Sequence, residues 1–244
     1  MLQIPFLPNC WKNLKFVKQD SSTPEVCFYK NHYFSRMAEN IDIWKEELVA
    51  CIGFLHQKGF APATSSNYSF SVPGTSQIHI SASGIDKGSF ATSDLMLIDA
   101  DGKAIEDNRK PSAETLLHTM IYRMQPETRC ILHTHTVYNT CLSAIYEPKE
   151  KLVLEGFEVL KGLSGIRTHE TSVEVPVFAN RQDIAALSVE VEDYWKQHPE
   201  MKGFLLAGHG LYTWGKSIAE AKRHIEVFEF LFECYYKINQ YKIS

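Results

Sequence analysis

Apolar residues recur at helical spacing in three long stretches of the chain. The first stretch begins near residue 38, and Gly59, a residue typical of helix C-termini, ends it. A second amphipathic helix is predicted over residues 181–198, and a third from Ser217 onward. Shorter helices are predicted over 112–124, 137–145 and 155–163. The third long helix carries an apolar stripe that predicts a core or subunit contact, formed by Ile218, Ala221, Ile225, Phe228, Phe232 and Tyr235.

Between these helices, short apolar or alternating stretches bounded by turn residues predict β-strands. Two of them flank the tripeptide Gly208-His209-Gly210, where the glycines allow the backbone to turn. The predicted strands cover residues 67–72, 77–81, 95–99, 130–135, 173–178, 204–207 and 211–214. This mixture predicts an α/β protein with a central, largely antiparallel sheet that is covered by helices.

The N-terminal residues differ from the rest of the chain. Residues 1–36 mix prolines, polar residues and aromatics without a clear period. We interpret them as an extension of unknown role that lies against the body of the protein or is partly disordered. Residues 37–244 are expected to form one packed domain, since a chain of this length can bury a substantial core.

The composition is that of an ordinary globular protein, with 44% hydrophobic residues, 22% charged residues and a formal net charge of −4. Because no basic stripe stands out, attraction to nucleic acid or to an anionic membrane has no electrostatic basis. The six cysteines contain no CxxC pair and are interpreted as reduced thiols. The chain lacks a leader-like start and any apolar run of membrane-spanning length, so the cytoplasm is the default compartment.

Two histidines stand one residue apart in the segment CILHTHTVYNT, at the end of an apolar run. In an extended strand His133 and His135 would face the same side and could bind one ion. The alternative is that one packs in the core and the other is solvated. His209, between Gly208 and Gly210, has little to pack against and would complete a set of three imidazoles. Such a set suits Zn²⁺ and leaves one coordination position open for substrate or water.

A metal-assisted reaction also needs a group that carries the proton, and two glutamates are candidates. Glu114 lies in the first turn of the helix that leads into the His133 strand, where an acidic residue can instead simply complement the helix dipole. Glu158 lies among apolar residues, and burial there would raise its pKa into a useful range. Its alternative is an ordinary solvated face.

Two loops rich in small hydroxyl residues are candidate phosphate-binding segments. They cover residues 64–69 (TSSNYS) and 81–84 (SASG), and Lys87 follows the second. Their hydroxyl and backbone N–H groups could surround a phosphate. As Ser/Gly turns alone they are weak evidence.

Residues 210–217 (GLYTWGKS) match the GxxxxGK[ST] pattern of nucleotide-binding loops. Such a loop must wrap its backbone closely around phosphates, whereas Leu211, Tyr212 and Trp214 alternate as in a strand. The chain also ends too soon after this segment for the further strands of a nucleotide-binding domain. We therefore reject nucleotide binding there.

The ordered motifs SSNYS, HISASG, KPSAE, LHTH and AGHG resemble the class II aldolase/adducin family over about residues 38–240. The resemblance implies a three-layer α/β/α catalytic domain, with one zinc ion per subunit on His133, His135 and His209. It also implies homotetramers with sites at subunit interfaces, and a phosphorylated sugar as substrate. The phosphate pocket would comprise Ser66, Asn67, Ser83, Gly84 and Ser112, with Lys87 nearby. Ala113 stands where phosphate-binding aldolases often have serine, so one phosphate contact would be lost.

Within that family, the segments LEGFEVLKGLSG, THE and VEVPVFANRQDIAAL are similar to a dehydratase branch that acts on a methylthio-substituted ketose phosphate in methionine salvage. In that branch the acid/base glutamate belongs to the E-x-x-K-G segment, which gives the role to Glu158. Glu114 matches the acid/base position of the aldolase branch, which leaves open which carboxylate does the work. The alternatives are an aldolase or epimerase of another sugar phosphate and a non-catalytic, adducin-like interaction protein.

Overall fold

The computed structural model describes residues 24–73, 75, 77–105 and 107–243, and its contacts divide the chain into two units, residues 1–41 and 42–244. Helix α1 (Pro24–Gln57) begins in the first unit, earlier than the start predicted near residue 38, and continues into the second. In the second unit its residues Leu48, Ile52 and Leu55 are completely buried, as their helical spacing predicts. Residues 24–36, for which no clear period was found, belong to this helix, whereas residues 1–23 lie outside the described residues, so the role of the extension over 1–36 stays a prediction.

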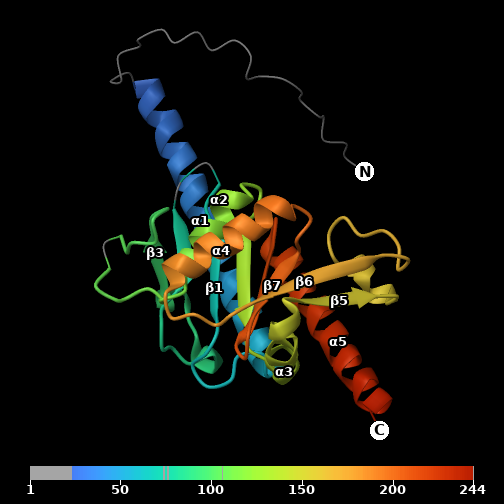
Figure 1. Ribbon diagram of the computed structural model, residues 1–244. Helices are drawn as coiled ribbons and strands as arrows, with labels where there is room; N and C mark the ends of the chain where they lie inside the picture. Colours follow the sequence, from blue (N-terminus) through green and yellow to red (C-terminus); the bar gives the residue numbers. More distant parts are fainter. Residues whose placement is uncertain (1–23, 74, 76, 106, 244) are drawn as a thin grey trace. The chain divides into compact units, whose positions relative to one another are not determined.

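The second unit is built around one sheet of eight strands (Figure 1). The strands are β1 (Asn67–Ser71), β2 (Ile78–Ser81), β3 (Leu95–Ile98), β4 (Cys130–Thr134), β5 (Lys151–Glu155), β6 (Ser172–Phe178), β7 (Gly203–Leu206) and β8 (Gly210–Gly215). Their order is β3-β2-β1-β4-β8-β7-β6-β5, and among these strands β6 and β7 form the one parallel pair. The predicted α/β class with a largely antiparallel sheet is thereby confirmed.

Helices cover both faces of this sheet. Helices α2 (Thr115–Met124) and α4 (Ile184–Gln197) pack together over one face, as Figure 1 shows, and share a core with Ile131 and Trp214 of the strands. Helices α3 (Val137–Tyr146) and α5 (Ile218–Ile243) contact β4 and β8 from the other face, toward which Thr134 points. The result is a three-layer α/β/α arrangement.

The chief difference from the predicted elements lies at the edge of the sheet. Strand β5 was not predicted, because its alternation of exposed Lys151 and Glu155 with buried Leu152 and Leu154 lasts only five residues. The helix predicted over 155–163 is a short 3₁₀ helix, η4 (Glu158–Gly162). The GLYTWG part of the nucleotide-loop pattern is strand β8, which pairs with both β4 and β7, so the rejection of that motif is confirmed.

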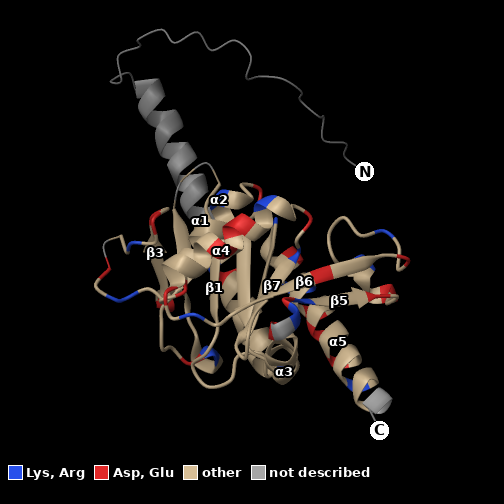
Figure 2. Cartoon of the chain, viewed as in Figure 1, with Lys and Arg blue, Asp and Glu red and all other residues tan. Residues whose placement is uncertain are grey.

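Charges, cysteines and helix hydropathy agree with the composition. Basic and acidic residues are interspersed along the described elements in the view of Figure 2. The cysteines whose side chains are described, Cys51, Cys130, Cys141 and Cys234, are free thiols. None of the described helices combines the length and the hydropathy that crossing a lipid bilayer requires.

Candidate active site and metal centre

The three candidate histidines come from one strand end and one turn. His133 lies in β4, and His135 directly follows Thr134, the last residue of that strand. His209 lies in the turn from β7 to β8 after Gly208, whose φ of +61° favours glycine. Gly210 allows close packing, since a Cβ there would lie 2.3 Å from a carbonyl oxygen of β4. Because β4 and β8 are neighbours, the three imidazoles meet at one end of the sheet.

The Nε2 atoms of these histidines face one another. Nε2 of His133 lies 2.8 Å from Nε2 of His135 and 3.3 Å from Nε2 of His209, and one ligand atom from each residue lies within 4.8 Å of the others. Nδ1 of His133 donates to the carbonyl oxygen of Leu211 at 2.9 Å, and Nδ1 of His209 lies 3.2 Å from the side-chain oxygen of Asn180. With protons on Nδ1, these rings turn their lone pairs toward the centre. A cation fits this donor set, because converging lone pairs repel unless a positive charge lies between them.

Burial keeps the imidazoles of His133 and His135 neutral. It lowers the pKa of His133 well below the ordinary value, although the nearby Glu114 acts in the opposite direction. It also lowers the pKa of His135 to about 4. Since metals bind the neutral form of imidazole, the buried position favours ligation at neutral pH.

Glu114 lies directly against this cluster, at the start of α2. Its Oε1 is 3.2 Å from Nε2 of His209, and its Oε2 is 3.5 Å from Nε2 of His133. Oε2 also accepts hydrogen bonds from Nδ2 of Asn67 at 2.5 Å and from the hydroxyl of Tyr212 at 2.7 Å. The side chain makes no capping hydrogen bond to α2, so the role of a helix-end charge does not explain its position.

The surroundings of Glu114 favour the ionised carboxylate. Burial alone would raise its pKa, but the imidazoles of His133 and His209 and the hydroxyl of Tyr212 lower that pKa below its ordinary value. The site therefore holds a partly buried anion beside the neutral imidazoles of His133 and His135.

A cavity of about 170 Å³ opens beside Glu114 and His135. Its wall consists of small polar residues from two loops, 64–67 and 81–84, and from the turn before α2. Five of the predicted phosphate-binding residues line it: Ser66, Asn67, Ser83, Gly84 and Ser112. The fold thus brings the two hydroxyl-rich loops to the histidine cluster.

Lys87, the sixth predicted phosphate-binding residue, lies behind the cavity wall. Its ammonium group donates to the carbonyl oxygens of Ile85 at 2.8 Å and Thr64 at 3.3 Å. Burial lowers its pKa, while the nearby acidic side chains of Asp86 and Asp94 act in the opposite direction. Because Thr64 itself lines the cavity, the lysine contributes positive potential there without direct contact.

Glu158 lies elsewhere, and the expectation that burial raises its pKa is wrong. Its side chain is 67% exposed, and it pairs with Lys161 and with Nδ1 of His169 at 3.1 Å. The hydrogen bond from Lys161 lowers its pKa. Helix η4 directs Leu160 into the core and leaves the carboxylate outside.

The strand register places Glu158 far from the histidines of the same chain. Phe178, the last residue of β6, bonds to the start of the turn that carries His209. Strand β5 runs antiparallel to β6, so Glu155 pairs with Ser172 at the other end of β6. That strand spans about 20 Å, and the three residues from Glu155 to Glu158 reach at most about 10 Å. One chain therefore does not bring its two candidate glutamates together.

Sequence reasoning missed three polar residues around the site. Tyr212 was predicted only as a strand position, and His118 was not among the candidate residues. Glu229 of α5 is buried and accepts hydrogen bonds from Thr136 at 2.6 Å and from Nδ2 of Asn139 at 2.9 Å. Burial raises the pKa of Glu229 to about 7. Its sequence signal is a glutamate four residues after Ile225, on the apolar stripe of the last helix.

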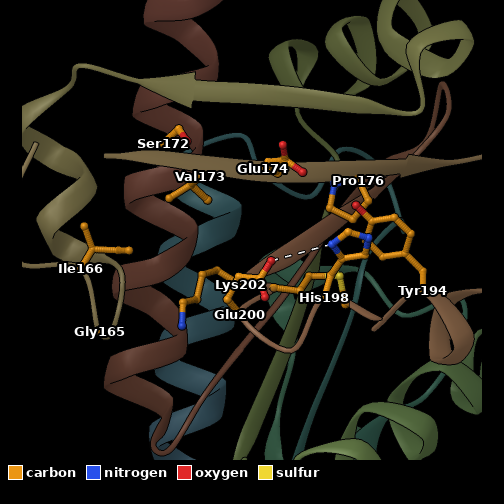
Figure 3. Close-up of a pocket in the computed structure, with 11 residues that line it drawn as sticks. Gly165, Ile166, Ser172, Val173, Glu174, Pro176, Tyr194, His198, Glu200 and Lys202 are labelled. Carbon is orange, nitrogen blue, oxygen red and sulfur yellow. Dashed lines mark ion pairs between the residues drawn. The ribbon is translucent and has the colours of Figure 1, made fainter. Parts of the chain in front are cut away.

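Two larger cavities lie away from this cluster. One of about 420 Å³ lies between strand β6 and the chain that follows α4 (Figure 3). There the ring of Tyr194 stacks on His198 at 4.1 Å, and Nδ1 of His198 faces Oε1 of Glu200 at 3.8 Å. The other, of about 450 Å³, borders β1 and the end of α2. Neither is lined by a predicted site residue, so converging ligands rather than volume identify the site.

Comparison with known proteins identifies the family of the chain. The family described as "Class II Aldolase and Adducin N-terminal domain" matches residues 46–236. A methylthioribulose-1-phosphate dehydratase from Marinobacter nauticus is 48% identical over 189 residues, which cover 78% of this chain and 90% of that protein. A protein of the same name from Stenotrophomonas maltophilia is 49% identical over 180 residues, 74% of this chain and 84% of that protein. The solved structure of an L-fuculose 1-phosphate aldolase has a TM-score of 0.68 at 23% identity and covers 81% of this chain and 87% of its own, which shows the shared fold.

Proposed function

Because this chain belongs to the class II aldolase and adducin family, we propose that it is a methylthioribulose-1-phosphate dehydratase. The proposed reaction removes water from 5-methylthioribulose 1-phosphate and gives 2,3-diketo-5-methylthiopentyl 1-phosphate, as a cytoplasmic step of methionine salvage. The names of relatives with nearly half their residues identical support the substrate. The observation that carries the proposal is the meeting of three histidines and Glu114 beside a hydroxyl-lined cavity.

Zinc, one ion per subunit, is the proposed cofactor, and His133, His135 and His209 would hold it. When bound, zinc supplies Lewis acidity, which makes a carbon next to a coordinated carbonyl more acidic. The carbonyl of Leu211 and the amide of Asn180 hold two of the imidazoles with Nε2 toward the centre, which preorganises the donor set.

We assign Glu114 the removal of the proton from C3 of the substrate. A base must be ionised and within reach, and this carboxylate is held ionised beside two of the ligands. Departure of the C4 hydroxyl then needs an acid, because hydroxide is a poor leaving group. After taking the proton, a carboxylic acid in this position is chemically able to supply one.

The phosphate is proposed to lie in the 170 Å³ cavity between the two loops. Small hydroxyl side chains and glycine allow an anion to approach the backbone N–H groups closely. The buried ammonium of Lys87 behind the wall favours an anionic ligand there.

Glu158 is proposed to act in the site of a neighbouring subunit. Within one chain it lies at the wrong end of the sheet, whereas its exposure leaves it free to meet another copy. The homotetramers and interface sites implied by the family resemblance would allow this. In such an interface, loss of water around Glu158 would raise its pKa toward the range that an acid needs.

Product analysis tests this proposal. The metal-loaded protein is incubated with 5-methylthioribulose 1-phosphate and the products are identified by mass spectrometry. Dehydration keeps the carbon chain whole and yields a dicarbonyl that has lost one water. Unchanged substrate would contradict the proposed function.

A sugar-phosphate aldolase is the second candidate. The observation in its favour is that Glu114, which matches the acid/base position of the aldolase branch, is the glutamate that contacts the histidines. Retro-aldol cleavage would give two carbon fragments from one substrate, which the same mass measurement detects.

A further inference from the structure

Glu114 stands at the end of a buried row of hydrogen bonds on the α2 side of β1. Oγ of Ser69 lies 2.8 Å from the hydroxyl of Tyr122 and 2.7 Å from Nδ1 of His118. Nε2 of His118 lies 2.5 Å from Oδ1 of Asn67, whose Nδ2 donates to Glu114. Ser69 and His118 are completely buried, so water does not compete for these contacts.

The chemistry of the members fixes the direction of the whole row. An ionised carboxylate only accepts, so Asn67 must turn its NH₂ group toward Glu114 and its carbonyl oxygen toward His118. That oxygen also only accepts, so the proton of His118 is on Nε2 and its Nδ1 is bare. Ser69 therefore donates to Nδ1 and accepts from Tyr122. Every donor in the row points toward Glu114.

We infer that His118 is a positioning residue, which locks the amide of Asn67 so that its NH₂ group holds Glu114 against the histidine cluster. Without the Nε2–H of His118, the oxygen of the Asn67 amide loses its donor and only the carboxylate holds the amide, so the NH₂ group is no longer fixed in the position that holds Glu114. Burial lowers the pKa of His118 to about 4, so the ring stays neutral and keeps the required single proton. The functional consequence rests on the proposed role of Glu114 in proton removal.

The first test needs no substitution and no substrate. Nitrogen-15 spectra of the imidazoles in the full-length protein report which ring nitrogen carries the proton. His118 is assigned by the signal that disappears in His118→Asn. The inference requires the neutral Nε2–H form at pH 7. A proton on Nδ1, or on both nitrogens, would overturn it, whatever reaction the protein catalyses.

The second test uses a matched pair of variants. His118→Gln keeps an NH₂ donor near the position of Nε2, whereas His118→Asn keeps an amide near Nδ1 and loses the contact with Asn67. We expect His118→Asn to lower kcat about 10-fold or more, with KM and zinc content nearly unchanged and a melting temperature that falls by only a few degrees. His118→Gln should stay within about threefold of the wild-type kcat.

The pair separates positioning from general packing. Equal losses in both variants would overturn the inference, as would a change confined to KM, because the row would then serve the core or substrate binding. Tyr122→Phe, which removes only the outermost donor, is expected to change kcat less than about twofold. If the wild-type protein releases no water from the substrate, the proposed function fails, while the proton position on His118 still tests the inference.

Discussion

Glu114 and Glu158 are both candidates for acid/base chemistry, and the fold treats them in opposite ways. Glu114 contacts two imidazoles, a tyrosine hydroxyl and an asparagine amide. Glu158 is 67% exposed, and its pKa is lowered by a hydrogen bond from Lys161. The first carboxylate has its surroundings fixed within one chain. The second acquires an enclosed environment only if something else covers it.

The difference teaches that apolar neighbours in sequence do not by themselves bury a carboxylate. In η4, Leu160 faces the core while Glu158 faces solvent, because one side of a surface helix packs against the protein and the opposite side is exposed. Glu114 precedes a helix whose packing places its carboxylate against Asn67 of β1, His133 of β4 and Tyr212 of β8. Tertiary position, rather than local composition, determines which group is preorganised.

The largest expected effect breaks the metal cluster beside Glu114. His209→Ala removes one of three ligands, so bound zinc should fall well below one ion per chain. Turnover should fall at least about 1,000-fold, since metal catalysis contributes several kcal/mol. The control is His198→Ala, in the separate cavity of about 420 Å³, which should keep wild-type zinc content and turnover. One zinc ion per chain in His209→Ala would contradict the role of His209 as a metal ligand.

The next effect separates the two glutamates. Glu114→Gln should lower kcat by about 10²–10⁴-fold, the usual contribution of a proton-transferring group, and should alter zinc affinity because the carboxylate contacts the ligands. Glu158→Gln should leave zinc affinity unchanged. Near wild-type turnover in Glu114→Gln would contradict the role of Glu114 and would mean that another residue transfers the proton.

Mixing of subunits from two variants tests whether Glu158 acts in its own chain or in the site of a neighbouring copy. If its site belongs to a neighbouring copy, mixed assemblies of Glu114→Gln and Glu158→Gln contain some sites with both native glutamates. Random mixing should restore roughly a quarter of the wild-type rate per chain. Absence of any recovery, with both single variants inactive and mixed assembly verified, would contradict action between subunits.

Glu229 is a third carboxylate to compare with Glu114 and Glu158, because it is buried and its hydrogen-bond partners are the neutral side chains of Thr134, Thr136 and Asn139. Its pKa of about 7 lies above the ordinary 4.5, so its contribution to stability is complete below pH 4.5 and is lost as the pH rises to 7. From pH 5 to pH 8, the wild-type protein should therefore lose about 2 kcal/mol more stability than Glu229→Gln. Denaturant unfolding of both metal-free proteins measures this, and parallel pH profiles would contradict it.

The smallest effect is expected at the exposed pair. Lys161→Ala removes a partner of Glu158 that lies in solvent, where screening and side-chain entropy cancel most of the attraction. The melting temperature should not change measurably. A clear drop would mean that the segment is more enclosed than the structure of one chain indicates.

The sequence predicted the meeting of the three histidines well and their polar surroundings poorly. Two histidines at strand spacing and a third between glycines are local patterns, and their convergence needed only that β4 and β8 be neighbours. Tyr212 and Asn67 both lie opposite His133 in the sheet, and that strand register is invisible in a single sequence. His118 is a histidine one turn into a helix, and its role depends on which strand that helix covers.

The elements of the fold also divide into those that the sequence predicts and those that it does not. Long helices and the strands around the histidines were predicted because their periods persist over enough residues. Strand β5, five residues long at the sheet edge, was missed, and with it the hairpin that carries Glu158 away from the site. Short edge elements leave too weak a pattern to predict.

Metal dependence of the water loss tests the central claim most directly. The protein is stripped with a chelator, its zinc content is measured, and dehydration of 5-methylthioribulose 1-phosphate is followed before and after zinc is returned. The account predicts that turnover disappears with the metal and returns as one zinc ion binds per chain. Full turnover by a preparation free of transition metal would contradict it.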